Sequence, residues 1–270
     1  MRFDSHTHTS FSFDANQDST PRLMCEAALR KGLSGIALTD HFDVNGAVEG
    51  IYDPFDADAS FRAALEVKEA YRGKLRVSCG IELGQATEYP KEAREFLNRH
   101  PYDFVLASIH NLPAVPDFYY LKYDDMPEAL YNSLFSRTLE EADRLCDFAG
   151  IHAIAHLTYM HRYLKNAGRE IDFQLHRDRL EALFKKMIRK DLALEINVSL
   201  LRNGVDLFMP DKELILQYKE LGGSLITVGS DAHTPDAVGL HIEDAYAFLR
   251  EIGIHAVAFY ERGIPDLIPI

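Results

Sequence analysis

The feature that most constrains this fold is a series of short apolar segments that end in polar residues and are separated from one another by helical patterns. Seven such segments occur, at residues 2–5, 35–41, 75–84, 103–111, 150–158, 192–199 and 224–233. Helical patterns separate them, as in TPRLMCEAALRKG, where Thr20 caps a helix, Pro21 lies in its first turn and Gly32 ends it. Strands that alternate with helices form parallel sheets buried on both faces. The pattern therefore predicts a single α/β barrel domain over residues 1–270.

The apolar segments end at residues that can carry chemistry. These residues are His6 and His8, Asp40 and His41, Glu82, His110, His156, Asn197, and Asp231 with His233. In a parallel barrel the active site forms at the carboxyl ends of the strands, so we expect these side chains to meet at one rim. Neutral imidazoles and carboxylates bind zinc, manganese and iron(II), and so many ligands suit two or three divalent ions. A carboxylate such as Glu82 can bridge two ions, an arrangement that favours displacement at phosphorus.

The composition limits the partners and the compartment. The chain has 29 basic and 42 acidic residues, a net charge of −13, which makes nucleic acid and anionic membranes poor partners. Cys25, Cys79 and Cys146 are widely spaced, which argues against a disulfide framework and fits a reducing compartment. The first residues show no secretory pattern, and no apolar stretch is long enough to span a bilayer. We therefore expect a cytoplasmic protein.

The ordered motifs resemble those of a known family. They are DSHTHTSFSFD, LTDH, GIELG, SIH, AHL, LEINVS and GSDAH, and they span nearly the whole chain. In this set and order they are similar to the PHP (polymerase and histidinol phosphatase) domain of metal-dependent phosphoesterases. The resemblance implies a distorted (β/α)7 barrel with a trinuclear metal site. It also implies hydrolysis of a small phosphomonoester.

The resemblance assigns roles to individual residues. It implies that one ion is held by His6, His8, Glu82 and Asp231, a second by Glu82, His110 and His156, and a third by Asp14, His41 and His233. Asp18 lies close to Asp14 and is the alternative to it, because the spacing after His8 varies in the family. Glu82, Asp231 and His233 are the catalytic residues that the resemblance implies. Asp4 and Asp40 are expected to orient histidines, and Asn197 to be a polar residue at the rim.

The substrate is predicted less directly. Arg162 and Arg202 resemble positions of the histidinol-phosphatase branch, which serves histidine biosynthesis, where an arginine can clamp phosphate. His161, beside Arg162, is a third candidate for the phosphate site. Thr158, His161 and the loop at 111–126 depart from the sequence pattern of the histidinol-phosphatase branch. The loop is a candidate lid or pocket wall, and its aromatic residues either stack on a substrate or pack the loop. L-Histidinol phosphate is thus the leading substrate, and another small phosphorylated metabolite is the alternative.

Two other classes of function are weighed against this one. An amidohydrolase-type barrel also begins with HxH and ends with an aspartate, but it typically lacks the TDH element and the second histidine of SDAH, both of which are present here. A PHP domain that serves only as a scaffold would have lost ligands, and every ligand position is filled in this chain.

Overall fold

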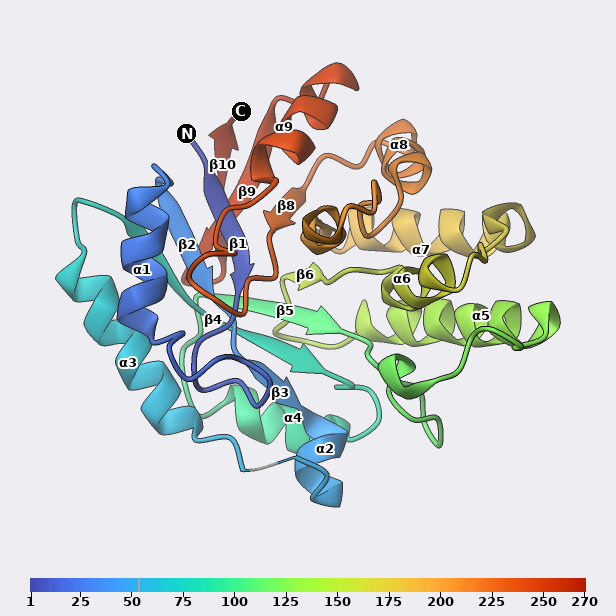
Figure 1. Ribbon diagram of the computed structural model, residues 1–270, viewed down its shortest axis with the longest axis horizontal. Coiled ribbons are helices and arrows are strands. Elements are labelled where there is room, and N and C mark those ends of the chain that lie inside the picture. Colours follow the sequence, from blue (N-terminus) through green and yellow to red (C-terminus); the bar gives the residue numbers. More distant parts are fainter. Residues whose placement is uncertain (53) are drawn as a thin grey trace.

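A barrel of parallel strands forms the centre of the molecule (Figure 1). The computed structural model describes residues 1–52 and 54–270. In this part of the chain the hydrogen-bonded order is β1-β2-β4-β5-β6-β7-β8, and all of these strands pair in parallel. Their bounds are β1 Phe3–Thr7, β2 Gly35–Leu38, β4 Arg76–Gly84, β5 Phe104–Ser108, β6 Ala153–Ile154, β7 Ala193–Asn197 and β8 Ile226–Gly229. The barrel predicted from the alternation of strands and helices is confirmed.

The barrel is nearly closed between its first and last strands. Thr7 and Ala232 form a single parallel bridge there. The backbone N–H of His8 donates to the carbonyl of Ala232 at 2.8 Å, and that of Asp231 donates to the carbonyl of His6 at 2.8 Å. The motifs at the two ends of the sequence, DSHTH and GSDAH, therefore lie side by side.

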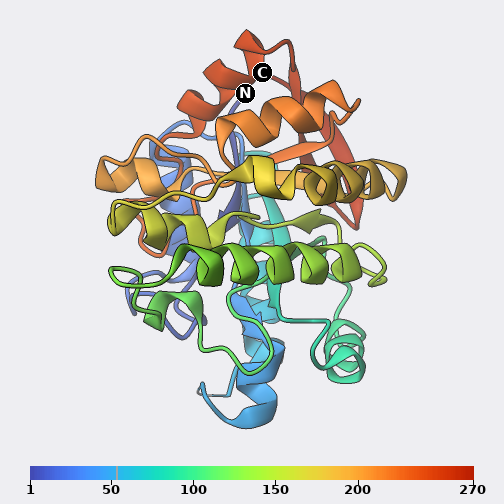
Figure 2. The same ribbon diagram turned by 90° about the vertical axis from the view of Figure 1, so that its right-hand side faces the viewer.

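Helices cover the outside of the barrel, and Figure 2 shows α5 and α7 lying across it side by side. The α-helices are α1 Pro21–Arg30, α2 Val44–Glu49, α3 Ala57–Ala70, α4 Pro90–Leu97, α5 Glu128–Leu145, α6 Tyr159–Asn166, α7 Arg177–Arg189, α8 Lys212–Glu220 and α9 Ile242–Glu251. Helix α1 begins as predicted, because the Thr20 side chain accepts a hydrogen bond of 3.3 Å from the N–H of Leu23. No helix in the described ranges combines the length and hydropathy that crossing a membrane requires.

A further short apolar segment near the end of the sequence, HAVAFY at residues 255–260, lies outside the barrel. It forms β9 (Ala256–Glu261), which pairs with β10 (Ile264–Pro269) in an antiparallel hairpin. The Phe259 ring lies 4.7 Å from Phe3 at the start of β1, and the Tyr260 ring lies 4.9 Å from Phe104 at the start of β5. The hairpin thus buries the apolar amino ends of the strands, while the predicted site lies at their carboxyl ends.

Short elements occupy the loops at the carboxyl ends of the strands. The strand β3 (His41–Asp43) pairs with the far end of β4, beyond the point where β2 stops. Three 3₁₀ turns follow in the chain, η1 Phe118–Tyr120, η2 Phe173–His176 and η3 Ser199–Asn203. The loop at 111–126 contains η1, which packs against α6.

Candidate metal centre and pocket

The nine side chains predicted as metal ligands lie in one cluster at the carboxyl ends of the strands. They are His6 on β1, His8 just after it, Asp14 in the following loop, His41 on β3, Glu82 on β4, His110 after β5, His156 after β6, and Asp231 and His233 after β8. The strand ends converge because the parallel register carries each strand into the same rim.

Glu82 lies at the centre of the cluster and is completely buried. Its Oε2 faces three imidazole nitrogens, at 3.1 Å from His6, 3.5 Å from His8 and 2.9 Å from His41. Its Oε1 faces two more, at 3.1 Å from His110 and 2.9 Å from His156. One carboxylate that faces five imidazoles from two oxygens has the arrangement required to bridge two cations.

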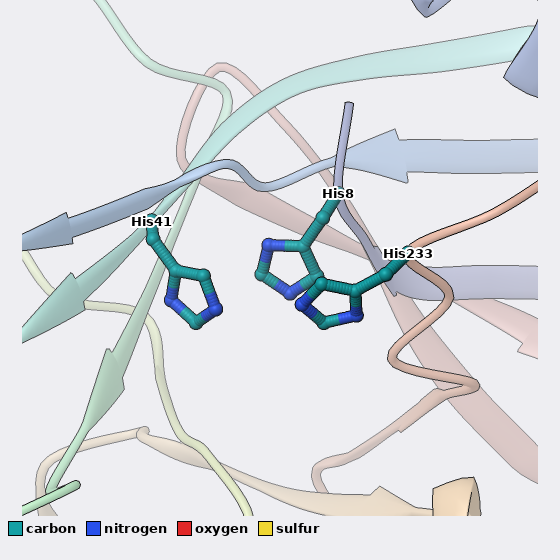
Figure 3. A group of neighbouring side chains, drawn as sticks. All are labelled: His8, His41 and His233. Carbon is teal, nitrogen blue, oxygen red and sulfur yellow. The ribbon is translucent and has the colours of Figure 1, made fainter. Parts of the chain in front are cut away.

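Asp231 and Asp14 supply the carboxylates on the other side of the cluster. Oδ1 of Asp231 lies 3.3 Å from Nε2 of His8 and 3.5 Å from Nδ1 of His233. Oδ2 of Asp14 lies 3.2 Å from Nε2 of His233 and 3.6 Å from Nε2 of His41. Figure 3 shows the rings of His8, His41 and His233 close together, and the His8 ring centre lies 4.2 Å from that of His41 and 4.0 Å from that of His233.

The arrangement of nitrogen and oxygen atoms suits divalent ions. Four groups of three within the described residues have ligand atoms within 4.8 Å of one another: His8–His41–His233, His6–His8–Asp231, His6–Glu82–His156 and His41–Asp43–His110. Nδ1 of His6 lies 2.6 Å from Glu195, so a neutral His6 carries its proton there and presents the Nε2 lone pair to Glu82 at 3.1 Å. A lone pair directed at a carboxylate is repulsive unless a metal ion or a second proton on the ring lies between them. Imidazole and carboxylate ligands are those of zinc, manganese and iron.

The charges within the cluster shift the pKa values of its carboxylates and imidazoles. Burial raises the pKa of Glu82, but the imidazoles of His41 and His6 outweigh this effect and hold that pKa well below its usual range. Asp231 shifts the same way, because the attraction of His6 and the hydrogen bond with His8 overcome burial and lower its pKa. Burial and the neighbouring histidines lower the pKa of His8 well below its usual value. Burial lowers the pKa of His6, His41 and His110, but the neighbouring carboxylates outweigh it: the pKa of His41 rises to about 9, and those of His6 and His110 rise well above the usual value. An ion bound at these imidazoles would therefore displace a proton, because the neutral ring is the form that ligates metal.

Two buried carboxylates behind the cluster were not predicted. Oε1 of Glu195 on β7 pairs with His6, and Asp43 on β3 lies 3.1 Å from Nδ1 of His110. A signal for Asp43 was present, because it follows His41 by two residues on a strand and so shares its face. The signal for Glu195 was a charged residue inside the apolar run LALEINVS.

The two aspartates expected to orient histidines have different environments. Asp40 accepts a 2.9 Å hydrogen bond from the Ser12 hydroxyl, whose oxygen lies 3.2 Å from Nδ1 of His8, so Asp40 reaches that ring through Ser12. Asp4 instead accepts hydrogen bonds from the N–H and hydroxyl of Ser230, at 2.9 and 2.6 Å, and so helps to join β1 to β8. Asn197, expected at the rim, is buried and its Nδ2 donates to Asp231 at 3.3 Å.

A pocket of about 530 Å³ opens onto the cluster. Its cluster side is formed by Asp14, His41, His110, His156, Asp231 and His233, and its other walls by Arg162, Arg202, Asp117 and the aromatic residues Phe13, Tyr52, Tyr119, Tyr120, Tyr159 and Tyr163. The loop at 111–126 therefore contributes Asp117, Tyr119 and Tyr120 to the wall, whereas Phe118 and Tyr123 are buried and pack the loop. The volume is that of a small-molecule site.

The structure brings two of the three predicted phosphate-binding residues to this pocket. Arg162 on α6 and Arg202 on η3 both line it. Arg202 is also held in place, because its guanidinium donates to the carbonyls of Ser230 at 2.7 Å and Asp231 at 3.1 Å. His161 does not line the pocket. Its ring is buried on the other face of α6, with Nδ1 3.1 Å from Asp211, because consecutive helical residues point in different directions.

The fold and the cluster define a class: parallel barrels with a candidate metal site at the carboxyl ends of their strands. A sequence model of the PHP domain matches residues 4–199, nearly three quarters of the chain. The chain belongs to the PHP domain family.

Several relatives match over almost the whole chain. A protein of Clostridium acetobutylicum named "probable histidinol-phosphatase" is 28% identical and covers 97% of this chain and 98% of its own. The histidinol-phosphatase of Lactococcus lactis subsp. lactis is 27% identical and covers 96% and 94%. A crystal structure of the histidinol phosphate phosphatase of Lactococcus lactis, complexed with zinc, L-histidinol and phosphate, is 25% identical, covers 98% of each chain and has a TM-score of 0.79.

Proposed function

We propose that this protein is a histidinol-phosphatase, a phosphoric monoester hydrolase that converts L-histidinol phosphate and water to L-histidinol and phosphate. The observation that carries the proposal is the pocket that joins the Glu82-centred cluster to two arginines and an aromatic wall. The relatives named histidinol-phosphatase, and the related structure that holds zinc, histidinol and phosphate, support the same reaction.

The proposed cofactor is two or three divalent ions, zinc, manganese or iron. The ligands would be those that the sequence predicted: His6, His8, Glu82 and Asp231; Glu82, His110 and His156; and Asp14, His41 and His233. Ions held there would supply positive charge to the phosphate and lower the pKa of the attacking water.

The arginines would bind the phosphate group of the ester. Arg202 uses two of its N–H groups on backbone carbonyls, so its guanidinium is fixed in orientation and keeps donors free for the pocket. Arg162 lies on the same pocket wall, with its guanidinium carbon 5.7 Å from the centre of the Tyr163 ring. Two guanidinium groups offer the planar donors that match phosphate oxygens.

The remaining walls would bind the alcohol part of the substrate. Tyr119 and Tyr120 are largely exposed at the mouth, and Tyr159 and Tyr163 lie deeper, where their hydroxyls are 2.7 Å apart. Such rings can stack on an imidazole. The carboxylate of Asp117 on the same wall suits an ammonium group. Part of this wall comes from the loop at 111–126, whose sequence departs from the histidinol-phosphatase branch. The loop nevertheless contributes Asp117, Tyr119 and Tyr120, whose carboxylate and aromatic rings suit this substrate.

The proposed catalytic residues are Glu82, Asp231 and His233. Asp231 and His233 line the pocket and so would contact the reacting phosphate, while Glu82 lies beneath it. Hydrolysis forms a bond from the water oxygen to phosphorus, breaks the bond from phosphorus to the alcohol oxygen, and passes a proton to that oxygen. Asp231 lines the pocket as a carboxylate and would accept a hydrogen bond from the attacking water, which would orient the water towards phosphorus.

Phosphate release from a substrate panel tests the proposal. The purified protein, loaded with zinc or manganese, would be assayed with L-histidinol phosphate, sugar phosphates and nucleotides. We expect kcat/KM to be highest for histidinol phosphate and to fall by more than about 100-fold in Asp231→Asn, which removes a charged group from the site. A preference for another ester would contradict the substrate, and release that survives complete removal of metal would contradict the mechanism.

We also propose the partner and the cellular compartment of the enzyme. A small phosphorylated metabolite is the proposed partner, without nucleic acid or membrane, and the cytoplasm is the proposed compartment. The three cysteines, all in the described part of the chain, are buried and unpaired, and burial raises each thiol pKa to about 12. Such thiols are unreactive, which is compatible with a reducing compartment.

A further inference from the structure

Glu195 is a buried carboxylate that joins two of the predicted metal ligands from behind. It lies on β7 with no exposed surface. Its Oε1 is 2.6 Å from Nδ1 of His6, and its Oε2 accepts a 2.7 Å hydrogen bond from the backbone N–H of His156. The strand β1, which carries His6, and the strand β6, which His156 follows, are not neighbours in the barrel. A single side chain therefore links the positions of two ligands that no strand pairing holds together.

Each of the two contacts acts on the geometry of a ligand. In a neutral His6, the contact with Glu195 places the proton on Nδ1, so that Nε2, which lies 3.1 Å from Glu82, presents its lone pair to an ion. His156 has a backbone φ of 21°, which residues other than glycine rarely adopt. The hydrogen bond from its N–H to Glu195 holds the backbone in that conformation, and so holds the ring 2.9 Å from Glu82.

Asp43 has the same relation to His110. It lies on β3 and is 5% exposed. Its two oxygens lie 3.1 and 3.3 Å from Nδ1 of His110, while Nε2 of the same ring lies 3.1 Å from Oε1 of Glu82. Both histidines thus have a carboxylate on Nδ1 and direct Nε2 at the same central glutamate.

A glycine on the neighbouring strand makes room for each carboxylate. A Cβ on Gly229 of β8 would lie 2.6 Å from Oε1 of Glu195 and 2.3 Å from Cβ of His6. A Cβ on Gly84 of β4 would lie 2.0 Å from Oδ1 of Asp43. Distances below about 3 Å are not compatible with non-bonded carbon and oxygen atoms. The glycines of the motifs GSDAH and GIELG therefore provide the space in which the two carboxylates lie.

We propose that Glu195 and Asp43 are positioning residues that set the tautomer and the ring orientation of His6 and His110. Gly229 and Gly84 complete this arrangement, because no other residue leaves room for the carboxylates. The inference rests on the proposed function only in requiring metal ions in the cluster, and it is independent of the ester that is hydrolysed. The competing role is that of a direct ligand for Asp43, since His41, Asp43 and His110 also form a group within 4.8 Å.

Metal binding by two conservative variants tests the inference. Metal-free Glu195→Gln and Asp43→Asn would be titrated with Zn²⁺ in competition with a chromophoric chelator, and the bound ions would be counted at saturation. We expect the affinity of at least one ion to fall about 10–100-fold in each variant, the usual effect of removing a carboxylate behind a histidine ligand. The number of ions at saturation should match the wild type. Cobalt(II) substitution gives a second readout, because a reoriented imidazole changes the visible absorption bands of the ion.

Asp103→Asn is the matched control. Asp103 is 4% exposed and accepts hydrogen bonds of 2.8 Å from the N–H groups of Cys79 and Arg262, near the hairpin that covers the other end of the barrel. This variant should lower the melting temperature and leave zinc affinity unchanged. Glu195→Asp, which keeps the charge but shortens the side chain, should also weaken zinc binding and serves if Glu195→Gln does not fold.

Three results would overturn the inference: wild-type zinc affinity in the Glu195 variants, a loss no larger than that of Asp103→Asn, or complete loss of one ion in Asp43→Asn, which would make Asp43 a ligand. Because the readout is metal binding, a wild-type protein that binds ions but hydrolyses a different ester would refute the proposed substrate alone.

Discussion

Replacement of Arg162 by methionine isolates the contribution of one pocket cation to catalysis. Arg162 lines the pocket, and its guanidinium carbon lies 5.7 Å from the centre of the Tyr163 ring. Arg202, by contrast, also donates to the carbonyls of Ser230 and Asp231. Methionine keeps much of the length and apolar surface of the arginine stem, so the change removes the charge and its donors while leaving the packing of α6 almost unaltered.

The expected loss follows from the number of hydrogen bonds to phosphate. A hydrogen bond to a charged group contributes about 1.5–3 kcal/mol. Since about 1.4 kcal/mol corresponds to a factor of ten in rate, the loss of one such bond lowers kcat/KM about 10- to 150-fold. A bidentate contact would cost more, up to the square of this factor. Because Arg202 and the metal ligands remain, we expect a fall of about 100-fold, with the free energy of unfolding within about 0.5 kcal/mol of the wild type.

Steady-state phosphate release and inhibition by inorganic phosphate measure this effect together. In Arg162→Met the inhibition constant for phosphate should rise along with the fall in kcat/KM, because both report binding to the same group. Arg189→Met is the control, since Arg189 is exposed at the end of α7 and its loss changes the net charge equally. A variant with kcat/KM within threefold of the wild type would refute the assignment of Arg162 to the phosphate site.

Three further predictions concern the same site. Arg202→Met should lower kcat/KM by a similar factor. It should also reduce the stability measured by thermal denaturation by about 1–3 kcal/mol, because the carbonyls of Ser230 and Asp231 each lose a hydrogen-bond donor. Unchanged stability would contradict this prediction. Removal of divalent ions by a chelator should abolish phosphate release and lower the melting temperature by about 5–10 °C. Ions at a free concentration of 100 times their Kd stabilise the folded protein by about 2.7 kcal/mol, and chelation removes this contribution. An unchanged melting temperature would argue against a bound metal cluster. Gly229→Ala should destabilise by about 1–3 kcal/mol and weaken zinc binding, because its Cβ would lie 2.6 Å from Oε1 of Glu195. Wild-type zinc affinity in the chelator competition would refute the crowding argument.

The barrel was predictable because its signals are local. Apolar runs of strand length, helical patterns between them and a cap such as Thr20 each depend on a few neighbouring residues, and together they indicate parallel strands. The short helices α2 and α6 were not predicted, and neither was α9. The hairpin of β9 and β10 was not predicted either, because its role is to cover strand starts that are distant in the sequence.

The members of the candidate site were predictable as a set, but their neighbours were not. His6, Glu82 and Asp231 come from motifs that could be read directly, and the structure places them together. Glu195 was missed because it lies inside an apolar run, and its role depends on contact with His6, which is distant in the sequence. His161 was predicted at the phosphate site from its position beside Arg162, yet the helix directs its ring towards Asp211.

The sequence by itself determined which kinds of side chain stand at the strand ends and in what order, because the periods of strands and helices are local properties of the chain. Only the tertiary structure decided which oxygen faces which nitrogen. That depends on the register of strands brought together from opposite ends of the chain, as at the bridge between Thr7 and Ala232. It also depends on the space left by glycines such as Gly84 and Gly229, which is defined only once the neighbouring strand is in place.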